Sequence, residues 1–257
     1  MAIVTLLTDF GWEDAYAGIL HGVILRLNPL ATIVDITHGI PPFDVHAAAY
    51  VLSTAYRFFP PDAIHVTVVD PGVGSERRPV AIRTECGTFV APDNGALSYV
   101  LDHEPICAAV HLTNPRFWLP VLSSTFHGRD IFAPVAAHLS LGVALEDMGP
   151  VLSDPHRLPL PEVETSGNAI IGRVVHVDHY GNLVTDIPQQ MLGERQLEIE
   201  IAGHRVCTLT RSFVGVSEGE LLAYWGSGGH LELGIRNGRA ADELAIHRFE
   251  RVTLRIL

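Results

Sequence analysis

The first 150 residues alternate short runs of β-branched residues with segments of helical period. The run at 64–69 is almost continuously apolar, as a strand covered on both faces should be. Alternation of this kind predicts an α/β domain with a mostly parallel sheet and helices on both faces, a Rossmann-like sandwich. The expected strands are 3–7, 32–36 and 64–69, and the expected helices are 15–27 and 45–57.

Further elements are expected in the same domain. Residues 80–83 and 88–91 predict two strands of a hairpin around a Gly-containing turn. One helix is expected to start near Asn94 and another to span 131–141. The α/β domain is therefore placed at residues 1–150.

The sequence changes character after this domain. Four prolines fall within twelve residues, which predicts an extended Pro-rich linker over 151–168. Beyond it, short alternating runs are separated by Gly-containing turns, as in a small antiparallel sandwich or barrel. A second, all-β domain is expected at 169–257. Its expected strands are 169–177, 197–201, 205–209, 221–225, 231–235 and 252–257.

The chain contains no lysine, and all seventeen of its Lys and Arg residues are arginine. These seventeen cations stand against twenty-nine Asp and Glu residues, for a net charge of −12. Without lysine, pyridoxal-phosphate enzymes, class I aldolases and P-loop proteins are excluded. An acidic chain also lacks the basic footprint of a nucleic-acid-binding protein. It permits a cationic small ligand, although acidic surfaces more often serve solubility.

Nothing in the sequence predicts export or a membrane span. The N-terminal segment has no basic residues and reaches Asp9 too early for a signal peptide. The most apolar stretch, 18–34, is interrupted by polar residues and a proline, whereas a span needs about 18 apolar residues. Three cysteines without CxxC spacing fit a reducing compartment. A cytoplasmic protein is expected.

An aspartate ends each of the first three expected strands: Asp9, Asp35 and Asp70. In open α/β sheets, ligands lie beyond the carboxyl ends of the strands, where acids can bind a ribose diol, a metal ion or a cationic substrate. The alternative is that these acids cap the following helices. Both alternatives stay open for Asp35. Asp9 and Asp70 precede Gly-containing turns, where backbone can approach a ligand closely, and this favours the ligand alternative.

The segment from Asp70 to Arg78 combines an acid at a strand end with two glycines and two arginines. Its two glycines permit a tight loop, and Arg77 or Arg78 can fold back on Asp70. Gly72-Val73-Gly74 is not a dinucleotide fingerprint, because the third glycine is missing and no helix follows. The segment therefore predicts a ligand-binding loop of another kind.

Fourteen histidines raise the question of a metal site. There is no HExxH motif, and in the tight cluster His176-Val177-Asp178-His179 a strand would turn His179 away from the other two. We therefore expect no metal site. His127 differs from the others because it lies at a loop-to-helix junction on the expected ligand edge. There it can orient or deprotonate a water molecule.

Five motifs occur in order over nearly the whole chain. They are Thr8-Asp9-Phe10-Gly11, Asp70-Pro71-Gly72-Val73-Gly74 with Arg77, Ala91-Pro92-Asp93-Asn94-Gly95, Thr125-Phe126-His127-Gly128-Arg129 and Asp178-His179-Tyr180-Gly181-Asn182. Together they resemble the S-adenosylmethionine hydrolases (hydroxide adenosyltransferases), relatives of the fluorinase and chlorinase. The resemblance implies an N-terminal α/β domain, a C-terminal β-barrel and a homotrimer. It further implies that S-adenosylmethionine is the substrate, bound between the N-domain of one subunit and the C-domain of its neighbour, and that no cofactor is needed.

The resemblance also implies roles for residues of the first domain. Asp70, Arg77 and His127 would form the triad that positions the attacking water. Asp9 would bind the ribose hydroxyls, and Asn94 would be a further substrate-binding residue.

In the second domain the resemblance implies contacts to both ends of the substrate. Asp178 would meet the methionine ammonium, and Ser227 would lie near the carboxylate. Asn182, Phe213 and the backbone around Gly238 would hold adenine.

The chain departs from the halogenating relatives at three positions. Those relatives carry a Tyr where Asp70 stands, and a serine or other small residue lines their halide pocket where this chain has Gly128. An Arg follows their serine that aligns with Ser227, whereas Gly228 follows it here. The last departure weakens the assignment of carboxylate binding to Ser227.

The implied reaction is coherent without a metal. Water or hydroxide attacks C5′ and displaces methionine, a neutral leaving group, so catalysis must place the nucleophile in line with the C5′–S bond. Asp70 and His127 can take up the proton, whereas Arg77 can only orient and stabilise hydroxide. Three alternatives stay open: a chloride-dependent halogenase, which the Asp70 carboxylate disfavours, a non-catalytic binder of S-adenosylmethionine or adenosine, and a metal-dependent hydrolase.

Overall fold

The chain folds into two compact units in the computed structural model, Met1–Pro159 and Leu160–Leu257. The structure describes residues 2–192, 197–206 and 209–256. The division falls inside the Pro-rich segment that the sequence singles out. Each unit has its own hydrophobic core.

A mixed sheet forms the centre of the first unit. Its strand order is β2-β1-β3-β5-β4-β6, and β4 runs antiparallel to both of its neighbours, while β2, β1, β3 and β5 are mutually parallel. The predicted α/β class with a mostly parallel sheet is confirmed. The strands are β1 (Ile3–Thr8), β2 (Thr32–Thr37), β3 (Ile64–Val68), β4 (Pro79–Thr84), β5 (Gly87–Pro92) and β6 (Ala108–His111).

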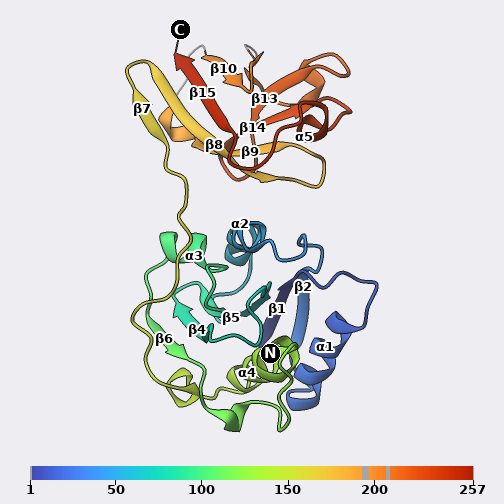
Figure 1. Cartoon of the computed structure of the whole chain (residues 1–257), viewed down its shortest axis with the longest axis vertical. Coiled ribbons are helices and arrows are strands. Elements are labelled where there is room, and N and C mark those ends of the chain that lie inside the picture. Colours follow the sequence, from blue (N-terminus) through green and yellow to red (C-terminus); the bar gives the residue numbers. More distant parts are fainter. Residues whose placement is uncertain (1, 193–196, 207–208, 257) are drawn as a thin grey trace. The chain divides into compact units, whose positions relative to one another are not determined.

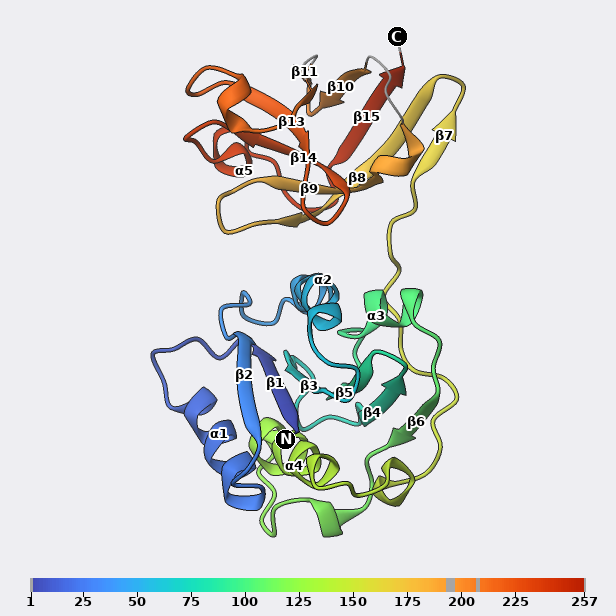
Figure 2. The same ribbon diagram turned by 180° about the vertical axis from the view of Figure 1, so that it is seen from behind.

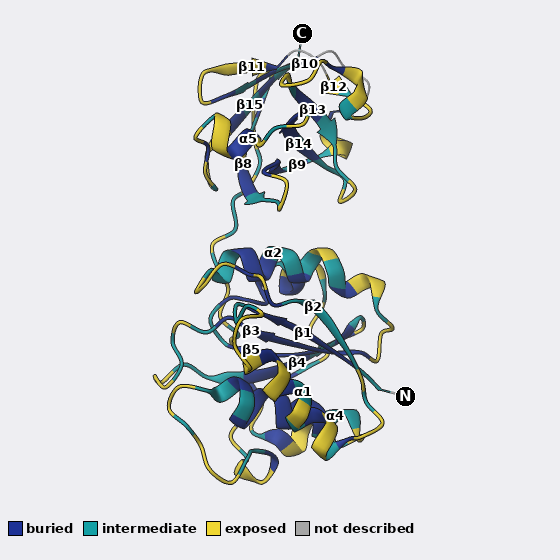
Figure 3. Cartoon of the chain, turned by 90° about the vertical axis from the view of Figure 1, so that its right-hand side faces the viewer, coloured by how far each residue is buried: buried dark blue, intermediate teal, exposed yellow. Residues whose placement is uncertain are grey.

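Helices cover both faces of this sheet (Figure 1). Helices α1 (Tyr16–Leu27) and α4 (Ala133–Ser140) pack on one face, and α2 (Val45–Ala55) and α3 (Ser98–His103) pack on the other. Figure 3 shows β1, β3, β4 and β5 as a largely buried layer between the two helix layers, because most of their side chains are apolar, whereas β2 is only partly buried. Short helical turns complete the unit: η1 (Tyr56–Phe58), η2 (Pro115–Phe117), η3 (Gly128–Phe132) and η4 (Leu145–Met148).

Element ends differ from the sequence expectations in several places. Strand β2 continues to Thr37, so Asp35 lies within the strand and not after it. The helix expected near Asn94 begins at Ser98, because the Asn94 side chain accepts the Ala96 amide and holds a turn there. The helix expected over 131–141 is preceded by the π-helical turn η3. Strand β6, which the sequence did not indicate, extends the sheet beyond the hairpin.

The second unit is a barrel-like structure whose strand pairs are antiparallel, apart from the parallel pair β12–β13 (Figure 2). Its strand order is β11-β10-β15-β8-β9-β14-β13-β12, with β7 paired to β8, and its inward side chains form one core. The predicted all-β class is confirmed. The elements are β7 (Glu164–Ser166), β8 (Ala169–Val177), β9 (Leu183–Pro188), η5 (Gln189–Met191), β10 (Leu197–Ile201), β11 (His204–Val206), β12 (Leu209–Thr210), η6 (Phe213–Gly215), β13 (Leu221–Trp225), β14 (His230–Ile235), α5 (Ala240–Glu243) and β15 (Arg251–Ile256).

Part of the expected linker is ordered structure. Residues 164–166 form β7, which pairs with β8, and Val151 bridges to Val110. Strand β9 was not expected from the sequence, although it lies at the centre of the strand order. Residues 207, 208 and 257, which belong to expected strands, lie outside the described residues. No helix within the described ranges is long and apolar enough to cross a membrane.

Candidate active site

Asp70, Arg77 and His127 are connected through the arginine. The Nε of Arg77 donates to both carboxylate oxygens of Asp70, at 2.9 and 3.0 Å, and its Nη2 also donates to Asp70 Oδ2. The same Nη2 lies 2.8 Å from Nδ1 of His127. The Asp70 and Arg77 side chains are only 5% and 9% exposed, so this ion pair is shielded from water.

The arrangement fixes which ring nitrogen of His127 holds a proton. A guanidinium is always protonated and only donates, so Nδ1 of His127 accepts and Nε2 carries the proton of the neutral ring. Burial lowers the pKa of His127 below its usual 6.5, and the charge of Arg77 lowers this pKa further. The neutral ring is therefore favoured next to the cation.

The loop that carries Asp70 and Arg77 depends on Gly74. Its φ is +79°, in the left-handed region that favours glycine, and a Cβ there would collide with the carbonyl oxygen of Ser124. Within the loop, the Ser75 hydroxyl donates to the Gly72 carbonyl at 2.6 Å. The segment after β3 thus packs directly against the segment that precedes His127.

That second segment is held by a buried acid. Asp130 is fully buried and accepts from the Ser123 amide at 2.7 Å and from Arg129 Nε at 2.6 Å. His127 precedes the π-helical turn η3, a feature frequent at functional sites. The segment is thereby fixed on both sides of His127.

Asp9 is positioned by a strained residue. Phe43, a non-glycine residue with φ of +68°, donates its amide to Oδ2 of Asp9 at 2.8 Å. Burial raises the pKa of Asp9, and the negative charge of Asp70 contributes in the same direction. Non-glycine residues with positive φ are concentrated at functional sites, and this one lies at a cavity.

A cavity of about 370 Å³ joins these residues. It brings together Asp9, Asp70 and His127 on one side and aromatic rings on the other. Phe10, Tyr16 and Phe126 pack with centroid distances of 5.2–5.7 Å. Its full lining is Asp9, Phe10, Tyr16, Pro42, Phe43, Val68, Asp70, Val73, Thr125, Phe126, His127 and Gly128. Such a site suits a ligand with both apolar and hydroxyl-bearing parts.

The second unit holds its own cluster of candidate residues. Asp178 Oδ1 accepts the backbone amide of Asn182, and Oδ2 accepts its side-chain amide, both at 2.8 Å. The side-chain oxygen Oδ1 of Asn182 and the Phe213 ring both approach Gly234, where an added Cβ would lie 2.6 and 2.9 Å from them. Asp178, Asn182 and Phe213 are therefore brought close together.

Glu232 is a further acid close to Asp178. Burial raises the pKa of Glu232, and the nearby charge of Asp178 contributes to the rise. The Tyr224 hydroxyl hydrogen-bonds to Glu232, and its ring lies 4.9 Å from that of Phe213. Two neighbouring carboxyl groups of this kind favour a bound cation.

Comparison with known proteins covers both units. The N-terminal domain of the SAM hydroxide adenosyltransferases matches residues 4–149, and the C-terminal domain of the same family matches residues 172–253. The chain belongs to the SAM hydroxide adenosyltransferase family.

Individual relatives agree with this assignment. The adenosyltransferase chain is 40% identical to an (R)-S-adenosyl-L-methionine hydrolase from Salinispora arenicola, over 95% of this chain and 94% of the relative. A protein of the same name from Thermus thermophilus is 38% identical, over 96% of both chains. Proteins named fluorinase match at lower identity, between 26% and 29%. The structure of an uncharacterized conserved protein from Thermotoga maritima superposes with a TM-score of 0.91 at 34% identity, covering 98% of this chain and 99% of that one.

Not every residue expected in an adenosyltransferase site lies at these clusters. The Asn94 side chain donates to the Val69 carbonyl at 2.8 Å and does not line the cavity, so its part in substrate binding stays a prediction. Ser227 is exposed in the turn between β13 and β14. Gly238 donates its amide to the Ile235 carbonyl at 3.1 Å. Arg78 pairs with Asp93 and Asp154, so of the two candidate arginines only Arg77 reaches Asp70.

Asp35 does not cap the following helix, and it lies away from the cavity. The cap of α2 is Asp44, whose side chain accepts the Ala47 amide at 2.9 Å. Asp35 instead lies beside His21 and His38. The physical reason is the extra length of β2, which keeps Asp35 in the ladder with β1.

Sequence reasoning missed two residues of the candidate clusters. Phe43 has no motif of its own, and its positive φ is set by the tertiary fold. Glu232 lies in an alternating strand, where an acid normally faces solvent. The signal that could have pointed to Glu232 is its position five residues after Ser227, across the same hairpin.

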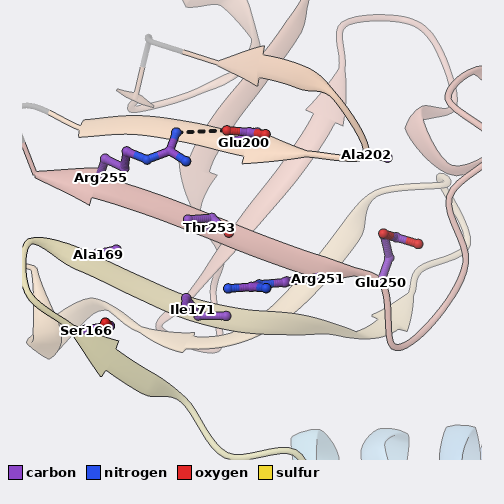
Figure 4. Close-up of a pocket in the computed structure, with 9 residues that line it drawn as sticks. All are labelled: Ser166, Ala169, Ile171, Glu200, Ala202, Glu250, Arg251, Thr253 and Arg255. Carbon is purple, nitrogen blue, oxygen red and sulfur yellow. Dashed lines mark hydrogen bonds and ion pairs between the residues drawn. The ribbon is translucent and has the colours of Figure 1, made fainter.

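The second unit also has an open hollow of about 450 Å³ over β7, β8, β10 and β15 (Figure 4). Arg255 reaches across it to Glu200, at 2.8 Å. None of the candidate site residues lines it.

Proposed function

We propose that this protein hydrolyses S-adenosyl-L-methionine to adenosine and L-methionine. The observation that carries the proposal is the connected group Asp70–Arg77–His127, of which Asp70 and His127 line the cavity of the first unit, in a chain of the SAM hydroxide adenosyltransferase family. The relatives named (R)-S-adenosyl-L-methionine hydrolase, at about 40% identity over most of the chain, support the same substrate and reaction.

The reaction balances with water alone. A water oxygen forms a bond to C5′, the C5′–S bond breaks, and its electron pair stays on sulfur as neutral methionine. One proton is released for each substrate. When the water is deprotonated as it attacks, the resulting hydroxide and the sulfonium neutralise each other's charge on the way to the transition state, and a site that excludes water favours this step.

The triad supplies position and charge for the nucleophile. Arg77 holds Asp70 through two nitrogens and His127 through one, so a water bound here meets groups of fixed orientation. The guanidinium stabilises hydroxide and cannot act as its base, which leaves Asp70 or His127 to take up the proton. Asp9, with Oδ2 already bonded to the Phe43 amide, binds the ribose hydroxyls in this proposal.

The second unit supplies the groups for the substrate's ends. The acidic pair of Asp178 and Glu232 suits the methionine ammonium, and Asn182 with Phe213 suits adenine, by an amide contact and ring stacking. Ser227 and the backbone at Gly238 are assigned to the carboxylate and to adenine by the resemblance alone.

Assembly as a homotrimer belongs to the same proposal. The substrate would lie between the first unit of one subunit and the second unit of its neighbour, as the resemblance implies. No cofactor is required, because water is the nucleophile and methionine the leaving group. Location in the cytoplasm stays a prediction from the sequence.

A chloride-dependent halogenase is the second candidate, since fluorinases are among the relatives. The Asp70 carboxylate, buried beside the proposed nucleophile site, argues against it because it repels a halide. A non-catalytic binder would leave the substrate unchanged.

One chromatographic assay separates these candidates. Incubation with S-adenosylmethionine should release adenosine and methionine, and D70A and H127A should each lower the rate at least about 100-fold. The exposed-residue variant H103A serves as the control and should keep full rate. Full activity in both site variants would contradict the mechanism. Formation of 5′-chloro-5′-deoxyadenosine in high chloride would favour the halogenase, and unchanged substrate would favour the binder.

A further inference from the structure

His21, Asp35 and His38 converge on one point of the first unit. Nε2 of His21 lies 2.8 Å from Oδ1 of Asp35, and Nε2 of His38 lies 3.0 Å from the same oxygen. Within the described residues these three side chains are the group whose metal-capable atoms all lie within 4.8 Å of one another. They come from α1, from β2 and from the segment directly after β2. None of them lines the cavity described above.

The buried histidine of this group is incompletely satisfied. His38 is 0% exposed, and its Nδ1 lies 2.7 Å from the Thr8 hydroxyl. Its Nε2 approaches Asp35 without hydrogen-bond geometry and has no hydrogen-bond partner among the described residues. A buried polar atom left in this way is destabilising, and at His38 it is directed at two further groups that can bind a metal.

The Thr8 contact orients this ring as in a metal-bound histidine. Histidines that bind a metal through one nitrogen hold the other by a hydrogen bond, which sets both tautomer and ring direction. When Nδ1 of His38 donates to Thr8, Nε2 presents a lone pair toward the Asp35 oxygen. Two electron-rich atoms at 3.0 Å repel each other unless a cation lies between them.

We propose that His21, Asp35 and His38 bind one divalent transition-metal ion of the Zn²⁺ class. Two imidazoles and one carboxylate suit Zn²⁺, Co²⁺ or Ni²⁺, whereas Ca²⁺ and Mg²⁺ prefer oxygen ligands. Metal–ligand bonds of about 2.0–2.2 Å place neighbouring ligand atoms roughly 3.0–3.5 Å apart, close to the separations present here. The His21 and Asp35 side chains are 32% and 23% exposed, which gives an ion a path of entry and leaves a position for water.

The proposed metal site contacts the residues that directly follow Asp9. The Gly11 amide donates to the His38 carbonyl at 2.8 Å, and the Trp12 ring packs edge-on against the His38 ring at 4.7 Å. Thr8, the partner of His38, also accepts the Phe10 amide at 3.2 Å. An ion here ties α1 to the end of β2 and stabilises this segment, without taking part in the reaction.

Binding is tested directly with Co²⁺ as the probe. Tag-free full-length protein, stripped with a chelator, is titrated with Co²⁺ and followed by its visible absorption and by calorimetry. One ion per chain should bind, and bound Zn²⁺ should raise the melting temperature. H21Q and D35N, at partly exposed positions, should each weaken Co²⁺ binding at least about 10-fold.

The control and the contrary outcomes are equally direct. H103Q, which removes an exposed histidine outside the group, should leave the affinity unchanged. The absence of saturable Co²⁺ binding in the wild type overturns the proposal. So does an affinity that is the same in H21Q, D35N and the wild type. Because the readouts are absorption, heat and melting temperature, the result does not depend on the hydrolase activity.

Discussion

Arg77 contacts both other members of the proposed triad through one planar guanidinium. Its planar guanidinium donates from Nε and Nη2 to Asp70 while Nη2 also reaches His127. A lysine ammonium has one nitrogen and no fixed fork, so it could not hold both partners in the same orientation. The absence of lysine from the chain is thus consistent with the requirement at this position.

His65 is a buried histidine whose lowered pKa links the stability of the fold to pH. It is fully buried in β3, its Nδ1 lies 2.8 Å from the Thr5 hydroxyl, and its ring stacks on Phe89 at 4.9 Å. Burial lowers the pKa of His65 to about 4. The ring is therefore neutral in the folded protein at neutral pH.

This pKa predicts a loss of stability in acid. Between pH 6.5 and pH 4 the unfolded chain binds a proton at His65 and the folded chain does not, so the free energy of unfolding falls as the pH falls. The contribution is about 1.4 kcal/mol per pH unit and about 3 kcal/mol over the whole window. Denaturant unfolding at pH 7.5 and 5.0 measures it. H65Q should be less stable at pH 7.5 but should show a shallower pH dependence, whereas H103Q should match the wild type. If the free energy of unfolding changed equally with pH in H65Q and the wild type, His65 would not be the cause of the loss of stability in acid.

At the scale of elements, the active site depends on two loops packed against each other. The loop after β3 carries Asp70 and Arg77, and the segment before η3 carries His127. They meet where Gly74 lies against the Ser124 carbonyl. The triad therefore forms only when both loops take their observed positions.

Substitution of Gly74 by alanine tests this packing, with G142A as a matched control. Both glycines have positive φ, +79° and +87°, so both variants carry backbone strain of about 1–2 kcal/mol. Only at Gly74 does the new Cβ also meet another segment, while Gly142 has nothing within 4 Å. G74A should lower kcat for adenosine release by about 100-fold. G142A should lose a similar amount of thermal stability and keep its kcat. Equal kcat in the two variants would show that the loop contact is unimportant.

At the scale of the whole molecule, the two units bear different parts of the proposed chemistry. The first unit holds the triad and Asp9, and the second holds the acidic pair of Asp178 and Glu232. In the proposed trimer, each substrate would use the first unit of one subunit and the second unit of its neighbour. Subunits that are defective in different units should then restore each other.

Co-expression of D70N and D178N measures that restoration. Each variant alone should be inactive, because one lacks the carboxylate of the triad and the other the anion for the ammonium. In a mixture of equal amounts, about a quarter of the shared sites combine two intact halves, so about a quarter of wild-type activity should return. Residual activity no greater than that of the separate variants would contradict a site shared between subunits. Full activity of D178N alone would contradict the role of Asp178.

Sequence alone determined the fold class, and it indicated Asp70, His127 and an arginine at position 77 or 78 as candidate site residues. Hydrophobic period separates the α/β region from the all-β region, because periodicity records which face of each element is buried. The loop from Asp70 to Arg78 and the junction at His127 are recognisable from local residue types. Local patterns did not give the ends of the elements, as the placement of Asp35 within β2 illustrates.

The tertiary structure decided the contacts between residues far apart in the chain. It selected Arg77 over Arg78 as the partner of Asp70, and it brought the Phe43 amide to Asp9. It also joined His21 and His38 at Asp35. Such contacts depend on strand register and on the packing of helices against the sheet, which no local pattern records. Sequence thus determined which chemical groups are present, and the packing of the fold decided which of them meet.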